Sequence, residues 1–213
     1  MATWAALVVV CGCVDTMHTH ETLTSKPSAQ IARLLELSLR KARLGCSPAI
    51  EAFESDFDTS DVCFAKAHVQ NHQDYTSYHL LFLLREQYPN IYGEIPEGTR
   101  ARILCSALEN TIVTNDWGLL DPEGSRDHRA GKALLELGDS ALAHLEPLLD
   151  NKDGALIAGN ESATTAWELR IRRADYAYRY MIKLLGREPV FVESLGERDR
   201  LIEKLKAEYT MTW

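Results

Sequence analysis

The chain of 213 residues is 46% hydrophobic and 25% charged, which is ordinary for a folded protein and too apolar for a disordered one. Its formal net charge of −8 argues against a general nucleic-acid binder, which needs a basic face to displace counterions from phosphates, and against binding to anionic membranes through the folded surface. The length allows one domain, or a small array of repeats, with a sizeable core.

The N-terminus begins with an uninterrupted apolar run, residues 4–10, far too short to span a bilayer, which needs about 20 apolar residues. Val10-Cys-Gly-Cys13 follows it. This pattern resembles the lipobox of bacterial lipoproteins, in which a small residue precedes the lipidated cysteine. The resemblance implies a cleavable signal over residues 1–13 with Cys13 as the lipidation site. The alternative is an apolar N-terminal strand or helix of a cytosolic protein.

Residues 14–28 are polar and rich in Thr and Ser, and Pro27 lies near their end. The segment has no apolar period, so it predicts a flexible tether. A single all-α domain is expected to occupy residues 29–213.

Apolar residues at helical spacing predict four main helices in the first half of this domain, over residues 29–44, 62–72, 76–88 and 99–113. Ser28 and Thr99 are suitable N-caps, and Pro48 is expected to open a short helix to residue 53. The helix over residues 76–88 is apolar almost all round, which predicts burial at the centre of the domain. Residues 54–61, 90–98 and 115–125 are predicted loops, with Trp117 anchored on neighbouring helices.

The second half is more regular. Helices are predicted over residues 126–137, closed by Gly138, and over residues 139–149, kinked by Pro147. After a loop over residues 151–162, a long helix over residues 164–185 and a last helix near residues 198–209 are expected; Val190-Phe-Val192 is the only β-like segment. The long helix has an apolar stripe at alternating steps of four and three: Trp167, Ile171, Ala174, Tyr178, Met181 and Leu185. The stripe predicts a buried Trp167, whose replacement by Ala would cost about 3–5 kcal/mol.

Three segments carry a resemblance to a known family. They are Ala133-Leu-Leu-Glu-Leu-Gly-Asp139, Ala141-Leu-Ala-His-Leu-Glu-Pro-Leu-Leu-Asp150, and the helix from Leu169 that closes at Gly186. They resemble HEAT repeats, particularly the short repeats of phycobilisome-lyase-type HEAT proteins. The resemblance implies an irregular HEAT-like stack of antiparallel helical hairpins, clearest over residues 126–186. Tyr176, Tyr178 and Tyr180 depart from it, because alanines are usual at these positions.

Histidines and cysteines give few further candidates. His68 and His72 would share a helix face, and with His79 they are the best candidate metal ligands, but Val69 holds the position that is Glu in His-Glu-x-x-His proteases. If the protein is exported, Cys46 and Cys63 are candidates for a disulfide. Cys105 lies in an apolar stripe and is expected to be buried.

Charged residues cluster around the start of the predicted long helix: Arg170, Arg172, Arg173 and Arg179, with Asp150, Asp153 and Asp175 nearby in sequence. Ion pairs between helices and a solvated basic face are equally good interpretations. Binding of an anionic partner is a third.

These observations predict a non-enzymatic helical-repeat module that binds a protein partner or has a structural role. Its lipid anchor would hold it to a membrane, facing the periplasm or the cell surface. We expect no catalytic residue, metal, cofactor or nucleic acid. The second hypothesis is a metal-dependent hydrolase that uses His68, His72 and His79, and the third is a cytoplasmic HEAT-like adaptor.

Overall fold

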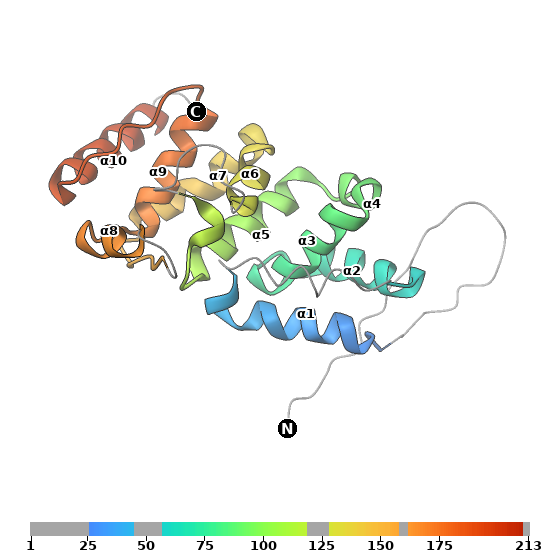
Figure 1. Ribbon diagram of the computed structural model, residues 1–213. Helices are drawn as coiled ribbons and strands as arrows, with labels where there is room; N and C mark the ends of the chain where they lie inside the picture. The colour runs from blue at the N-terminus through green and yellow to red at the C-terminus, as the bar shows by residue number, and fades with distance from the viewer. Residues whose placement is uncertain (1–25, 45–56, 119–127, 158–161, 211–213) are drawn as a thin grey trace.

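The computed structural model describes residues 26–44, 57–118, 128–157 and 162–210. Within these ranges the backbone forms no strand, only the isolated bridges Val113–Leu156 and Gly154–Arg172. The protein is therefore all-α, as its sequence predicts. The described residues form ten α-helices (Figure 1): α1 (Ala29–Leu39), α2 (Thr59–Asn71), α3 (Tyr78–Gln87), α4 (Pro89–Gly93), α5 (Glu97–Asn110), α6 (Arg129–Leu135), α7 (Leu142–Leu145), α8 (Ser162–Glu168), α9 (Arg173–Leu184) and α10 (Leu195–Thr210).

Helices that are close in sequence pack together along the molecule. At one end α1 and α2 both contact α3, and at the other α10 contacts α9 (Figure 1). Between them, α5 contacts α3, α6 and α7. One cluster of buried apolar side chains joins the helices, from Ile31 in α1 to Leu205 in α10.

Helix α1 begins where expected and ends early. The Ser28 hydroxyl accepts a hydrogen bond from the Ile31 N–H at 3.2 Å, so Ser28 is the N-cap. The helix ends at Leu39 and not at residue 44, and a short 3₁₀ turn, Lys41–Arg43, follows. The buried face is Ile31, Leu34 and Ser38, which leaves Leu39 largely exposed.

The predicted burial of the helix over residues 76–88 is confirmed, and the predictions for the segments on either side of it are corrected. All residues from 78 to 84 on α3 are buried, as the apolar composition predicts. The Asp58 carboxylate caps α2 by accepting from the Asp61 N–H, so the predicted acidic loop is helical from Thr59 onward. Pro89 does stop α3, but it also opens α4 within the predicted 90–98 loop, because proline suits the first turn of a helix. The helix predicted over residues 48–53 lies outside the described residues.

Helix α5 starts two residues before the predicted cap. Its N-cap is Pro96, and Thr99 lies buried inside the helix, so the cap predicted at Thr99 is wrong. Trp117, in the 3₁₀ turn Asn115–Trp117, is fully buried and contacts Tyr180, which confirms the predicted anchor.

The segment between Gly138 and Asp150 is less regular than predicted. Helix α6 ends at Leu135, and Gly138 adopts a positive φ of 56°. The helix predicted over residues 139–149 is divided into a 3₁₀ turn (Gly138–Ala141), the single turn of α7 and a second 3₁₀ turn (Glu146–Asp150). Pro147 stands at the start of that last turn, where its missing N–H is tolerated, so it redirects the chain instead of kinking one helix.

The largest correction concerns the predicted long helix over residues 164–185. It is two helices, α8 and α9, separated at Arg170, whose φ is +50°. The buried face of α9 centres on Tyr176, Tyr180 and Met181, while Tyr178 and Leu185 are only half-buried. Trp167, on α8, is 75% exposed, so the prediction that it lies in the core is wrong. Its replacement by Ala should therefore have little effect on stability.

Two tyrosines of α9, at positions where HEAT repeats usually have alanine, form polar contacts with residues 114 and 117. The Tyr176 hydroxyl hydrogen-bonds the Thr114 hydroxyl at 2.7 Å, and the Tyr180 hydroxyl donates to the Trp117 carbonyl. Gly131 on α6 lies against Tyr180: a Cβ there would meet the Tyr180 hydroxyl at 2.6 Å. Alanine at position 180 would remove the hydroxyl that donates to the Trp117 carbonyl, and alanine at position 176 would remove one of the two hydrogen bonds of the Thr114 hydroxyl, which also donates to the Leu156 carbonyl.

The C-terminal helix α10 is longer at its start than predicted, and it buries Arg198, Ile202 and Leu205. Residues 190–192 form no strand, and Val190 and Phe191 are exposed. None of the helices in the described ranges is long and apolar enough to cross a bilayer.

Candidate ligand-binding pocket

The turn between α8 and α9 is built like a helix C-terminus that normally carries glycine. The Ile171 N–H donates to the Ala166 carbonyl and the Arg170 N–H donates to the Trp167 carbonyl, both at 3.1 Å. This pair of bonds is a Schellman motif, with Arg170 in the left-handed position. Ala166 and Ile171 are both buried, which supplies the apolar contact typical of the motif.

Helix α9 begins after this turn because a distant segment satisfies its first N–H groups. The Arg173 N–H donates to the Asp153 carbonyl at 3.1 Å, and the Ala174 N–H donates to the Asn151 carbonyl at 2.9 Å. The Ala155 N–H in turn donates to the Ile171 carbonyl at 2.9 Å. Unsatisfied N–H groups at a buried helix start are costly, so these bonds fix the direction of α9 relative to α8.

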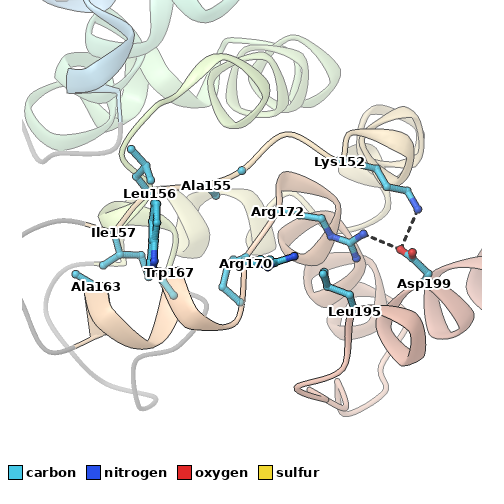
Figure 2. Close-up of a pocket in the computed structure, with 13 residues that line it drawn as sticks. Lys152, Ala155, Leu156, Ile157, Ala163, Trp167, Arg170, Arg172, Leu195 and Asp199 are labelled. Atoms are coloured by element: carbon cyan, nitrogen blue, oxygen red, sulfur yellow. Dashed lines mark hydrogen bonds and ion pairs between the residues drawn. The ribbon is translucent and has the colours of Figure 1, made fainter.

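A cavity of about 650 Å³ lies between this turn, the 152–157 segment and the start of α10 (Figure 2). Its volume is in the range of small-molecule and side-chain binding sites. Its wall is divided in two (Figure 2): Trp167, Leu156, Ile157 and Ala163 lie together on one side, and Lys152, Arg172, Asp199 and Leu195 lie on the other.

The apolar side of the pocket is open to solvent. Trp167 is 75% exposed and Leu156 is 49% exposed. Exposed apolar side chains of this size beside a cavity are a feature typical of interaction surfaces.

Arg170 lies between the two sides in Figure 2. Its side chain is exposed, and among the described residues its guanidinium has no hydrogen bond or ion pair. Its φ of +50° is unfavourable for a residue with a Cβ, by about 1–2 kcal/mol. The pocket therefore contains a cation held in a strained conformation.

The charged side is already neutralised by Asp199. One carboxylate oxygen, Oδ1, accepts from Lys152 Nζ at 2.9 Å and from Arg172 Nη1 at 2.7 Å. Hydrogen bonds from Lys152 and Arg172, together with their charges, hold the pKa of Asp199 below its usual value. Asp199 is thus an ionised partner of two cations and is not placed to act as a free base.

Behind the pocket wall, Arg172 joins a buried ionic cluster. Asp175 accepts from Arg172 Nη2 at 3.0 Å and from the Arg172 backbone N–H at 2.9 Å, and it also pairs with Arg198 Nη1. The Arg172, Asp175 and Arg198 side chains are all less than 10% exposed. Burial acts to lower the pKa of Arg172, but the bonds to Asp175 and Asp199 outweigh it and raise the pKa.

The predicted arginine cluster is therefore divided. Arg172 and Arg173 are buried in ion pairs, the second with Asp153 at 3.8 Å, and Arg170 is the exposed member. Asp150 pairs with Lys206 and not with these arginines.

Sequence reasoning missed Lys152, Arg198 and Asp199, three charged residues that complete the pocket and the cluster. Lys152 lies in a predicted loop, and the other two lie near the start of α10, which begins at Leu195. No spacing rule connects these segments with residues 170–175. The only local signal is the presence of charged residues near the start of a helix.

The three histidines of the hydrolase hypothesis are not brought together. His68 of α2 stacks on His72, the C-cap of that helix, with ring centroids 4.1 Å apart. His79 is buried in α3, where its Nδ1 lies 2.8 Å from the Ser38 hydroxyl. The described residues contain no group of three or more His, Cys, Asp or Glu side chains arranged to hold a metal ion.

The cysteine predictions have different outcomes. Cys105 is buried, as expected, and burial raises the pKa of its thiol. Cys13 and Cys46 lie outside the described residues, so the lipidation site and the disulfide with Cys63 stay predictions.

In the described part of the chain, the pocket near Arg170 is thus the place where exposed apolar surface, an available cation and a cavity coincide. These features are suited to binding a ligand. Comparison of the chain with models of protein families, with curated proteins and with solved structures gives no match.

Proposed function

We propose that the protein is a non-enzymatic binding module that engages a protein partner through the α8–α9 pocket. The observation that carries the proposal is that an exposed Trp167 and Arg170, which has no carboxylate partner among the described residues, both lie on the rim of one cavity. Tryptophan and arginine are among the residue types that contribute most to binding at protein interfaces.

A protein is favoured over a small molecule as the partner, because the pocket would leave much of the surface of a small ligand exposed to solvent. Sites for small ligands usually bury most of the ligand surface. Here the indole of Trp167 and the side chain of Leu156 face solvent, so a small ligand on them would itself stay exposed. A partner protein brings its own surface, which would exclude water from both side chains.

A photo-crosslinking amino acid at position 167 tests this proposal. The control has the same crosslinker at position 90, an exposed residue on α4 far from α8 (Figure 1). We expect position 167, and not position 90, to give a discrete adduct. Excess unlabelled wild-type protein should suppress it, whereas excess Trp167→Ala protein should not. Equal adducts at both positions, or equal competition by the two proteins, would exclude the pocket as the interface.

We also propose that the helices form an irregular HEAT-like stack, with residues 126–186 as its most repeat-like part. The support is the sequence pattern of that segment together with the packing of α9 against α6 and α7. Modules of this kind bind partners through surfaces shared by successive helices.

The N-terminal sequence supports a membrane location, with Cys13 as a lipid attachment site. In a bacterial host we expect the protein to fractionate with membranes and Cys13→Ser to release it, because two or more acyl chains give stable anchoring. Cys11→Ser is the matched control and should remain in the membrane fraction. Native protein whose intact mass retains Met1 and no lipid would instead favour the cytoplasmic adaptor.

A further inference from the structure

We infer that the pocket recognises a peptide segment in which an apolar side chain lies next to a carboxylate, and that Arg170 selects the carboxylate. The inference rests on the proposed function, since it names the chemistry of the partner segment. Three observations carry it: the charge distribution in the pocket, the position of Trp167, and the backbone of Arg170.

The charges leave one place for an incoming anion. The pocket wall holds three cations, Lys152, Arg170 and Arg172, and one carboxylate, Asp199. Asp199 already binds Lys152 and Arg172, and Arg172 is also paired with Asp175. Arg170 is the cation in this wall that lacks a carboxylate among the described residues. Its planar guanidinium can bind a carboxylate through two parallel hydrogen bonds.

The apolar part of the ligand has an equally defined place. Trp167 precedes Arg170 by three residues, and the Schellman turn keeps both on the pocket rim. An apolar side chain next to the bound carboxylate would cover the indole and Leu156, the two exposed apolar groups of the wall. The favourable energy of that contact comes from removing apolar surface from water.

The backbone conformation at Arg170 is one that arginine adopts only at an energetic cost. Helix α9 ends in the same motif: the Arg187 N–H donates to the Ile182 carbonyl, and the left-handed position is Gly186, with φ of +70°. Glycine has no steric penalty there, whereas arginine does. Strain at a ligand-lining residue is typical of a side chain kept for binding and not for stability.

Asp199 makes the site selective for a single carboxylate. A second acidic group placed near Lys152 and Arg172 would meet the ionised Asp199, and like charges at close range repel. The segment recognised should therefore have one acidic residue, or a free C-terminal carboxylate, beside its apolar residue.

The test is selection from a displayed library of random heptapeptides against wild-type protein, followed by titration of selected peptides. We expect enrichment of one acidic group adjacent to Leu, Ile, Phe or Trp. Arg170→Gly should raise the melting temperature and weaken binding about 10- to 100-fold, as loss of a charge-assisted contact does. Arg170→Lys should recover part of the affinity, because it restores the charge without the planar geometry.

Two further variants complete the test. Trp167→Ala should weaken binding of the same peptides without lowering the melting temperature. Asp199→Asn should improve binding of peptides with two acidic residues relative to those with one. Enriched peptides without an acidic group, or equal affinity for wild type and Arg170→Gly, would overturn the inference. No enrichment at all would also overturn it, while adducts confined to position 167 would leave the proposed function standing.

Discussion

Asp175→Ala is expected to lower the free energy of unfolding by about 3–5 kcal/mol, because it leaves the buried guanidinium of Arg198 without its carboxylate and leaves Arg172 with only the partly exposed Asp199. Asp175 is the shared partner of Arg172 and Arg198, and its side chain is only 3% exposed. A typical domain has about 5–15 kcal/mol of stability in total, so the loss should be visible as a large shift of the urea midpoint. Far-ultraviolet circular dichroism during urea unfolding measures it.

Asp199→Ala is the matched control. It removes a carboxylate that also binds Arg172, but the Asp199 side chain is 38% exposed and Arg172 keeps Asp175. The expected loss is about 1 kcal/mol or less, as for solvent-screened ion pairs. Equal losses of unfolding free energy for the two substitutions would show that burial does not increase the contribution of Asp175 to stability.

The second large effect is a loss of folding stability on acidification, which we expect from the buried side chain of His79. Burial lowers the pKa of His79 to about 4, from an ordinary value of 6.5. The unfolded chain takes up a proton at this histidine near pH 6.5, and the folded protein only near pH 4. The contribution of neutral His79 to stability is therefore fully present above pH 6.5 and is lost as the pH falls from 6.5 to 4. The difference in pKa corresponds to a loss of about 3 kcal/mol.

His79→Asn isolates this contribution. Asparagine does not titrate, and its amide lies near the position of Nδ1, the ring nitrogen 2.8 Å from the Ser38 hydroxyl. The variant should lose less stability than wild type between pH 7 and pH 4, although its smaller side chain lowers stability at neutral pH. Burial also lowers the pKa of His144, but that side chain is only partly buried, so His144→Asn should change the pH dependence little. Parallel stability curves for wild type and His79→Asn would contradict the assignment.

Features set by neighbouring residues could be predicted from the sequence. Ser28 caps α1 through a hydrogen bond to the residue three positions on, and capping rules describe that distance. The burial of α3 follows from its composition, and Gly138 and Gly186 occupy the left-handed positions that glycine favours.

The break at Arg170 could not be predicted in this way. The steps of four and three from Trp167 to Ile171 and Ala174 continue through it, so an apolar period cannot reveal it. No glycine or proline stands at the turn. The interruption depends on hydrogen bonds from α9 to residues 151 and 153, which are distant in sequence. The pocket was missed for the same reason, since this break forms it.

The candidate site was predicted only in part. Sequence reasoning identified the arginine cluster and left ion pairing and solvation as equal alternatives, because it could not tell which side of the chain each arginine occupies. The structure assigns Arg172 and Arg173 to the interior and Arg170 to the surface. Asp199 was missed because its role depends on how α10 packs beside the turn.

The two tryptophans in the described part of the chain offer separate optical signals. Trp117 is buried beside Tyr180, and Trp167 is exposed on the pocket rim. Indole fluorescence moves to shorter wavelength when water is excluded and to longer wavelength when water enters. In a protein with Trp4 and Trp213 replaced by Phe, ligand binding would therefore shift the emission of Trp167 to the blue, while unfolding would shift that of Trp117 to the red. Occupancy and stability could then be followed in one sample, because the two processes change the spectrum in opposite directions.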